Sequence, residues 1–455
     1  MKRTLLLLSP LLLSSCLFGP DYAGPKDLGL PVTWVNALPP ASDKADLATW
    51  WQSFNDPQLS SLIQQGFDNN PDIVTAALAI EKAQSILHQN ELNLLPNVGF
   101  SAGGANAGNY KTSTSHGSFN GALSMSWTPD VWGKTRRSIE AAVASVGSQE
   151  AAANATRTAL AANIATSYFN WISAKEGLRI AKEQLAYQER TFGITEQKAA
   201  EGVGMASALD LAEARANIAN TRARIPQLEA AIRTSENRLA TLLGTTVDRV
   251  HLTMPAESVY NLVPSVPVGL PSELLRRRPD VIRAEKELHA ACANIGVEIA
   301  AMFPSVSLTG STNGRAGTDF SRFWQSTAWS LTANVAHQAL NKNYYHEYLN
   351  QARLADAAAA ENYRKTVLAA FAEVEDSLIT YAQMTNQLPE YEASRDANKQ
   401  AAELSLRRYN AGECDFLNVA SAENQWLSAE LNIINTRQNI RIALAKLCTA
   451  LGGGW

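Results

Sequence analysis

The chain contains an internal repeat that covers most of its length. Pro71-Asp72 and Pro279-Asp280 lie 208 positions apart. The same offset relates Pro96 to Pro304, and Leu243-Gly244 to Leu451-Gly452. Landmarks at one constant offset indicate two copies of one structural unit, at 71–244 and 279–452, joined by a Pro-rich linker over 245–278.

The N-terminus has the pattern of a bacterial targeting segment. Lys2 and Arg3 precede the apolar stretch 5–13, which is too short for a membrane-spanning helix of about 20 residues. Leu13-Ser14-Ser15-Cys16 resembles a lipobox, so residues 1–15 are predicted to be a signal peptide and Cys16 to carry covalent lipid. The alternative is an ordinary signal peptide with an incidental cysteine. Leu17, where an aspartate would retain a lipoprotein at the inner membrane, favours the outer membrane.

The segment 16–70 lies outside the repeat, and its prolines predict a largely extended, lipidated N-terminal region. The remaining cysteines, Cys292, Cys414 and Cys448, are odd in number, and we expect no structural disulfide.

The composition argues against several function classes. Charged residues make up 18% of the chain, the net charge is −4 and no basic block occurs, which disfavours nucleic acid as a partner. Six histidines and four cysteines without CxxC or HxxxH spacing leave little material for a metal site. No Gly-rich phosphate loop or GxSxG motif is present. We therefore expect no enzyme activity, no metal and no cofactor apart from the lipid on Cys16.

Each copy of the repeat predicts a helix, two strands, a long helix, a tight turn and a second long helix. The strands are expected at 95–107, 118–129, 303–314 and 327–339, where apolar residues alternate with small polar ones. Such alternation fits a sheet half-buried on a soluble core, or membrane strands with lipid on one side and water on the other. Polar, Gly-rich hairpin linkers and flanking aromatics such as Trp127 and Trp329 are typical of membrane strands.

Four strands are too few to close a membrane barrel, which needs about eight. Open strand edges are not tolerated in lipid. If these strands span a membrane, the barrel must be shared among subunits, and a ring of identical chains is the natural closure.

The long segments 136–201 and 343–408 are predicted to be helical, and at about 1.5 Å per residue each would extend about 100 Å. Pro389 should kink or break the second, and Pro226 should bend the helix that follows the first. The return helices carry apolar residues at intervals of seven, which favours coiled-coil packing. These residues are Ile218, Ile225, Ile232 and Leu239 in the first copy, and Trp426, Ile433, Ile440 and Leu447 in the second.

Several motifs resemble one family over the whole mature chain. Cys16 is followed by Gly19-Pro20-Asp21-Tyr22, and Trp50-Trp51 precedes Asp56-Pro57. The most specific motif is 269–280, Gly-Leu-Pro-Ser-Glu-Leu-Leu-Arg-Arg-Arg-Pro-Asp, after which come Ile295-Gly296 and Phe303-Pro304. The chain resembles the TolC-type outer-membrane factors, in the branch of OprM- and NodT-type outer-membrane efflux lipoproteins.

The resemblance implies a mainly α fold with a small transmembrane β part. Three chains would form a 12-helix periplasmic tunnel and a shared 12-stranded barrel in the outer membrane. This homotrimer would be a passive duct of a tripartite efflux system, fed by a periplasmic adaptor and an inner-membrane pump of the resistance-nodulation-division type. The alternatives are an outer-membrane component for type I polypeptide secretion or metal export, or a structural coiled-coil envelope lipoprotein.

The resemblance also implies a periplasmic gate at the hairpin tips. It places Val203, Gly204 and Gly412 at the tip turns, where an adaptor would dock, and it matches Asp210 to an acidic lock position and Tyr409 to its tyrosine partner. Cys414 stands where the family often has arginine, and Asn418 and Ser421 stand where carboxylates are common. A carboxylate ring would then come from Asp210 and Glu213, or the gate is weaker. The alternative is that both acids are solvated charges on a helix face.

Overall fold

The structure is a computed structural model of the 455-residue chain. It describes residues 17–26, 28–29, 31, 33–36, 47–109, 114–201, 207–260, 274–316, 323–337 and 342–455. The predicted signal peptide, Cys16, Val203 and Gly204 lie outside these residues. The chain divides into two compact units. One comprises Met1–Leu28, Ala77–Ala151 and Ile282–Thr366, and the other comprises Gly29–Ala76, Ala152–Val281 and Val367–Trp455. Each unit takes segments from both copies of the repeat.

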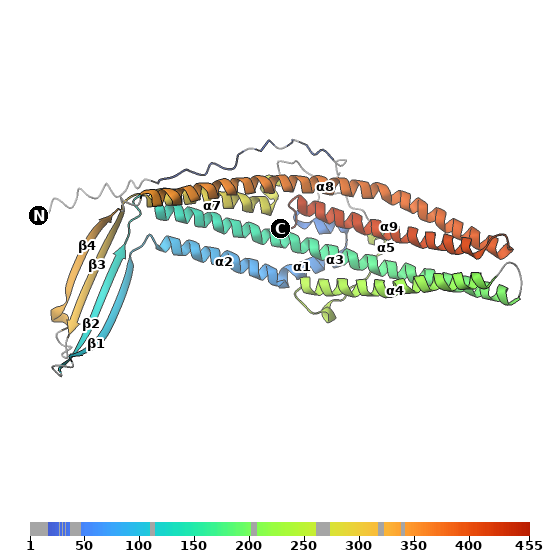
Figure 1. Ribbon diagram of the computed structural model, residues 1–455, viewed down its shortest axis with the longest axis horizontal. Coiled ribbons are helices and arrows are strands. Elements are labelled where there is room, and N and C mark those ends of the chain that lie inside the picture. The colour runs from blue at the N-terminus through green and yellow to red at the C-terminus, as the bar shows by residue number, and fades with distance from the viewer. Residues whose placement is uncertain are drawn as a thin grey trace. The chain divides into compact units, whose positions relative to one another are not determined.

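Helices account for most of the described chain, in the order shown in Figure 1. The α-helices are α1 (Pro57–Asn69), α2 (Pro71–Leu92), α3 (Lys134–Glu201), α4 (Ala208–Leu242), α5 (Glu257–Tyr260), α6 (Leu274–Arg277), α7 (Pro279–Ala301), α8 (Lys342–Ala411) and α9 (Phe416–Ala450). Short 3-10 helices are η1 (Leu47–Phe54), η2 (Val247–Arg249) and η5 (Trp324–Ser326). Asp72 and Asp280 lie in the first turns of α2 and α7, where a negative charge favours the helix dipole.

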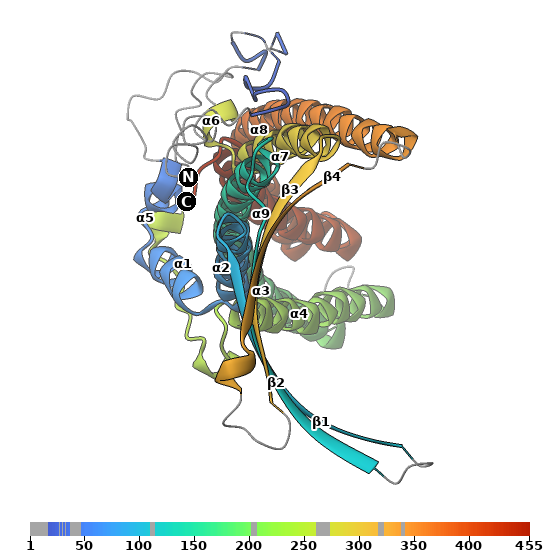
Figure 2. The same cartoon turned by 90° about the vertical axis from the view of Figure 1, so that its left-hand side faces the viewer.

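A single antiparallel sheet lies in the first unit. Its strands are β1 (Asn97–Asn109), β2 (Thr114–Trp127), β3 (Ser305–Ala316) and β4 (Ala328–Ala336), side by side in that order (Figure 1). The β2–β3 pairing, in which Trp127 lies opposite Leu308, joins the two copies of the repeat. Figure 2 shows that the sheet is curved. β1 and β4 are its edges, and neither pairs with another strand in the described part of the chain.

The strand bounds differ from the predicted ones by one to four residues. β1 and β3 each begin at the residue directly after a proline, which is Pro96 for β1 and Pro304 for β3. Proline has no N–H to give to a ladder, so it limits how early each strand can start. At the other end of the first hairpin, pairing of Asn109 with Thr114 extends β2 earlier than expected.

The two faces of the sheet differ in polarity. Register places Phe100 opposite Leu123 and Leu331 opposite Gly310 on one face, and Ser311 opposite Ser330 on the other. The two serine hydroxyls lie 2.9 Å apart. The apolar face is exposed in the single chain, with Phe100 78% exposed. The alternation read from the sequence is therefore present, but no core of the described chain covers its apolar side.

The second unit contains most of two helical hairpins, built by α3 with α4 and by α8 with α9. The seven-residue pattern faces its interior: Leu239, Ile440 and Leu447 are all fully buried. The core also takes in Trp50, Trp51 and Phe54 of η1 and the α3 residues Tyr168, Phe169 and Trp171. Tyr168 donates a hydrogen bond of 2.9 Å to Asp56, which caps the N-terminus of α1. The mainly helical fold with a small β part is confirmed.

Both long hairpins continue through internal prolines. Pro226 lies inside α4 and Pro389 lies inside α8, so the break considered for Pro389 does not occur. Both prolines are exposed. Water can therefore hydrate the carbonyl that each proline leaves without its helical donor, which lowers the cost of keeping the helix intact.

The arginine-proline-aspartate motif ties three segments of the second unit together. Arg278 is 8% exposed, and its guanidinium donates to the carbonyl of Ala450 at 2.8 Å. It also pairs with Asp280 at 2.7 Å and Glu373 at 2.8 Å. The motif thereby satisfies a carbonyl at the C-terminal end of α9 and links it to α8.

None of the helices in the described part of the chain combines the length and apolarity needed to cross a membrane.

Candidate functional site

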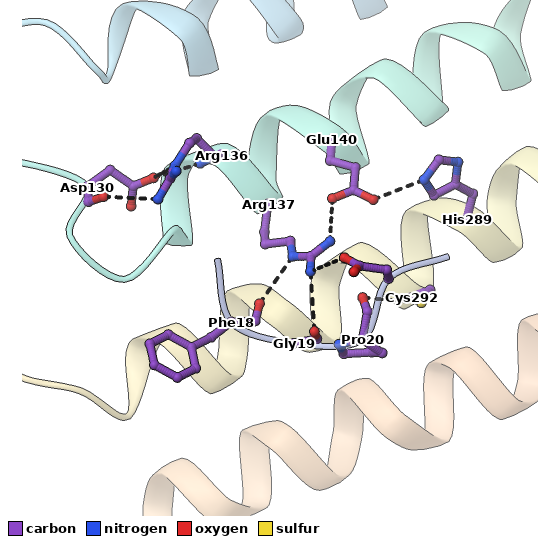
Figure 3. Close-up of polar contacts among 10 residues, drawn as sticks. Phe18, Gly19, Pro20, Asp130, Arg136, Arg137, Glu140, His289 and Cys292 are labelled. Atoms are coloured by element: carbon purple, nitrogen blue, oxygen red, sulfur yellow. Dashed lines mark hydrogen bonds and ion pairs between the residues drawn. The ribbon is translucent and has the colours of Figure 1, made fainter. Parts of the chain in front are cut away.

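The segment that follows Cys16 is held to the first unit by a buried arginine. Arg137 lies in the first turn of α3 and is 1% exposed. Its guanidinium donates to the carbonyls of Phe18 at 3.1 Å and Gly19 at 3.3 Å (Figure 3). It also pairs with the carboxylates of Asp21 and Glu140, each at 2.7 Å. We call Arg137 and these four partners the N-terminal clamp.

The clamp depends on close backbone approach between the N-terminal segment and α7. Gly19 has a φ of +106°, which favours glycine, and a Cβ there would collide with the backbone of Gly296. A Cβ on Gly296 would in turn lie 2.8 Å from the carbonyl oxygen of Phe18. The two glycines of the family-like motifs are thus a packing pair, although they are far apart in sequence.

Aromatic side chains flank the clamp on both sides. The ring of Phe18 stacks on Phe303 at 4.6 Å, and Phe303 stacks on Trp132 at 5.0 Å. On the other side, Tyr22 stacks on His289 at 4.4 Å, and Nε2 of His289 lies 3.1 Å from Oε1 of Glu140. The attachment therefore starts two residues after the predicted lipidation position and continues to residue 22.

Sequence reasoning singled out Gly19, Asp21 and Gly296 only as motif residues and missed Arg137. One signal was present: α3 has no acidic residue in its first turn, yet Arg136 and Arg137 lie there. Cations at a helix N-terminus oppose the helix dipole. Their presence indicates nearby acceptors, which are Asp130 for Arg136 and the clamp for Arg137.

At the hairpin tips, the structure brings Asp210 and Tyr409 together. Tyr409 is 4% exposed and packs with Ala214 and Phe416. Burial raises the pKa of Tyr409, and the nearby charge of Asp210 raises it further. The gate role expected for the pair stays a prediction, because the described structure contains no hydrogen bond between the two side chains.

Asp210 also has a local role in its own helix. Its carboxylate accepts from the backbone N–H of Ser207 at 2.9 Å, and its own N–H donates to the Ser207 hydroxyl at 3.3 Å. This capping box begins α4 and leaves Asp210 only 6% exposed, so Asp210 is not a solvated helix-face charge. Glu213 is half-buried, and Gly412 adopts a φ of +75° in an open tip turn between α8 and α9.

A lysine fastens one hairpin to the other near these tips. The ammonium of Lys198, in the last turn of α3, donates to the carbonyl of Tyr409 at 3.1 Å and to that of Asn410 at 2.9 Å. It also lies 5.0 Å from the centre of the Tyr409 ring. A cation here satisfies carbonyls at the C-terminal end of α8, where the helix dipole favours positive charge.

A metal site or a reactive cysteine would be a further candidate site beside the N-terminal clamp and the hairpin tips. No group of three or more His, Cys, Asp or Glu side chains that could hold a metal ion is present among the described residues. Cys448 is fully buried, and Cys292 and Cys414 are half-buried. The exposed features are a sheet with one apolar and one polar face and the described tips of the helical hairpins, where Leu209 is 65% and Leu417 is 60% exposed.

Replacing Arg137 with leucine should release the N-terminal segment. Hydrogen bonds to a charged group contribute about 1.5–3 kcal/mol each. We therefore expect amide hydrogen exchange of residues 18–22 to accelerate on the order of ten-fold or more in Arg137→Leu.

Arg283→Leu is the matched control, since Arg283 is an exposed arginine of α7 that pairs with Glu287 at 2.8 Å. It should leave exchange of residues 18–22 unchanged. Equal exchange in wild type and Arg137→Leu would show that the clamp does not hold this segment.

Comparison with known proteins assigns the family. Residues 62–245 and 270–453 match the outer membrane efflux protein family. The chain is 31% identical to the antibiotic efflux pump outer membrane protein ArpC of Pseudomonas putida, over 98% of this chain and 94% of ArpC. It is 30% identical to the pyoverdine export outer membrane protein OpmQ of Pseudomonas aeruginosa, over 100% and 97%. It is 29% identical to the probable outer membrane lipoprotein SilC of Salmonella typhimurium, over 92% and 91%.

Solved structures agree with this assignment. The outer-membrane channel OprN superposes with a TM-score of 0.88 at 28% identity, covering 97% of this chain and 100% of OprN. The MtrE outer membrane channel of Neisseria gonorrhoeae, in its open state, gives a TM-score of 0.86 at 28% identity, covering 96% and 98%. The chain therefore belongs to the outer membrane efflux protein family and is an outer-membrane channel of an efflux system.

Proposed function

We propose that three copies of this chain form one duct, with a shared 12-stranded barrel and a 12-helix tunnel. Members of the family form trimeric channels in tripartite efflux systems. The observation that carries the proposal is the four-stranded sheet with two unpaired edges. A β-structure in lipid must close on itself, because unpaired backbone groups there cost several kcal/mol each. Three sheets of four strands meet that requirement.

Surfaces left open in the single chain support the same assembly. Helix α2 has no buried residue, although Leu78 and Ile86 lie on it with 57% and 48% of their surface exposed. On the sheet, the apolar face suits lipid and the serine- and threonine-lined face suits water. A structural coiled-coil lipoprotein would need neither face.

We further propose that a periplasmic adaptor and an inner-membrane pump of the resistance-nodulation-division type deliver cargo to this duct. The duct would conduct passively, without a catalytic step or a cofactor. The named relatives carry different cargoes, antibiotics in one case and pyoverdine in another. A water-lined passage does not have to recognise its cargo, and on the likeness to these relatives we propose small molecules of more than one kind as the cargo class.

Cys16 is proposed to carry the covalent lipid that anchors the chain in the outer membrane. SilC, a relative of similar length, is described as a probable outer membrane lipoprotein. The clamp supports this proposal, since it fixes the chain two residues beyond Cys16 to the same unit that carries the sheet.

Deleting the gene tests the efflux role. We expect the deletion strain to become hypersensitive to several unrelated antibiotics, dyes and detergents, because no outlet remains for the pump. Intact protein should restore resistance, and Cys16→Ala should restore it less and lose incorporation of labelled palmitate. Sensitivity to one metal alone would indicate metal export, and loss of one secreted polypeptide would indicate type I secretion.

The tip residues are proposed to hold the periplasmic end closed. Asp210→Asn combined with Glu213→Gln removes both charges while retaining side-chain size, and the amide oxygen of Asn can still accept from the backbone N–H of Ser207. We expect a higher single-channel conductance in planar bilayers. Glu229→Gln, an exposed carboxylate farther along α4, is the control and should conduct like wild type. Unchanged conductance in the double variant would contradict a gate role for these acids.

A further inference from the structure

A glutamate is buried between the two hairpins of the second unit. Glu423 lies on α9 and is 1% exposed. The amide of Asn217, on α4, donates to its Oε2 at 3.3 Å. The other helix of that hairpin contacts the backbone of Glu423, because Nε2 of Gln184, on α3, lies 3.5 Å from the Glu423 carbonyl oxygen. Glu423 therefore lies where α9 packs against both helices of the other hairpin.

The polar groups at this position are incompletely paired. Oε1 of Glu423 and Oδ1 of Asn217 are buried without a hydrogen-bond partner. Neither amide atom of Gln188, one helical turn beyond Gln184, has a partner, and Gln188 is 3% exposed. Buried polar atoms without partners cost about 1–3 kcal/mol each in general, so they call for an explanation.

Protonation of Glu423 would explain how these unpaired polar atoms are tolerated. An ionised carboxylate only accepts hydrogen bonds, whereas a protonated carboxyl also donates one. The donated bond can use Oδ1 of Asn217, which is otherwise unpaired and belongs to the amide that already contacts the carboxyl. No basic side chain in the described chain forms an ion pair with Glu423 that would stabilise the ionised form.

The neighbouring titratable groups do not change this conclusion. On α3, burial raises the pKa of Tyr187, and the charges of Glu423 and of Glu403, on α8, raise it further. Arg190, also on α3, lowers it. On α4, the contact residue is the neutral Asn217. Burial raises the pKa of Glu423 to about 7, while the hydroxyl of Thr191, on α3, and the amide of Asn217 lower it less.

We propose that Glu423 is a proton-binding site that couples the surrounding pH to the packing of the two hairpins. With the carboxyl protonated, α9 packs tightly against α3 and α4. When the carboxyl loses its proton, a charge lies in a buried, incompletely paired position, and the hairpins separate more readily. The duct would thus be more loosely packed near its tips in neutral and alkaline surroundings than in acid.

The sign follows from linkage. A carboxyl whose pKa is higher in the packed state than in the open state favours packing at low pH. That contribution is fully present below the ordinary carboxyl pKa and is lost as pH rises to about 7. Above that value the carboxyl is ionised in both states, and the difference in free energy between the packed and the open state no longer changes with pH.

Hydrogen exchange of the full-length protein in detergent tests the proposal. Exchange is followed in α9 around residues 416–427 and in α3 around 184–195, and corrected for the intrinsic pH dependence of exchange. We expect protection to fall on the order of ten-fold or more between about pH 5 and pH 8 in wild type. Glu423→Gln stays neutral and should show a corrected protection that does not vary with pH.

Glu403→Gln is the matched control, because Glu403 is an exposed carboxylate that acts on the same Tyr187. It should retain the wild-type profile. If Glu423→Gln does not fold, the wild-type profile and Asn217→Leu still decide the question. Asn217→Leu removes the hydrogen-bond partner of both forms of the carboxyl, so the pH range of the decline should shift from that of the wild type. A flat wild-type profile, or a wild-type profile in folded Glu423→Gln, would overturn the proposal.

Discussion

Among the described residues, the sheet has two unpaired edges and a largely exposed apolar face, and a stable structure of this chain has to satisfy both. In water, the apolar face of β1 and β4 would be an aggregation surface. In lipid, the unpaired N–H and C=O groups of the edges would be too costly. Only closure with further strands satisfies both demands. The single chain is therefore an incomplete structure, and we expect its exposed apolar side chains to contact lipid and neighbouring chains.

Buried charges mark the places where segments distant in sequence must stay together. Arg137 fixes the N-terminal segment within the first unit, and Arg278 fixes the end of α9 within the second. Both guanidiniums have carboxylate and carbonyl acceptors, so their burial is compensated. Glu423 differs, because its burial is only partly compensated. A group of this kind responds to its surroundings, whereas the two arginines hold their contacts over the whole physiological pH range.

Much of the fold could be predicted from the sequence because its signals are periodic. The offset of 208, the alternation in the strands and the seven-residue pattern of the return helices each specify local structure. The arginines in the first turn of α3 indicate that acceptors lie nearby, but the partners of Arg137 could not be predicted, because hydrogen bonds to the carbonyls of Phe18 and Gly19 leave no pattern at either position. The break considered for Pro389 was wrong because an exposed helix face tolerates the missing hydrogen bond. At the tip, the family resemblance identified Asp210 but not its place in the capping box, which depends on the conformation of Ser207.

The central claim is that the sheet is completed by two further copies of the chain. Its most direct test is the mass of the purified full-length complex in detergent, measured by native mass spectrometry. The account predicts three times the mass of the mature, acylated chain, with no stable monomer that retains the β-structure. A monomer or dimer that keeps its strands folded in detergent would contradict it, because the edges of β1 and β4 would then be stable without the closure proposed for them.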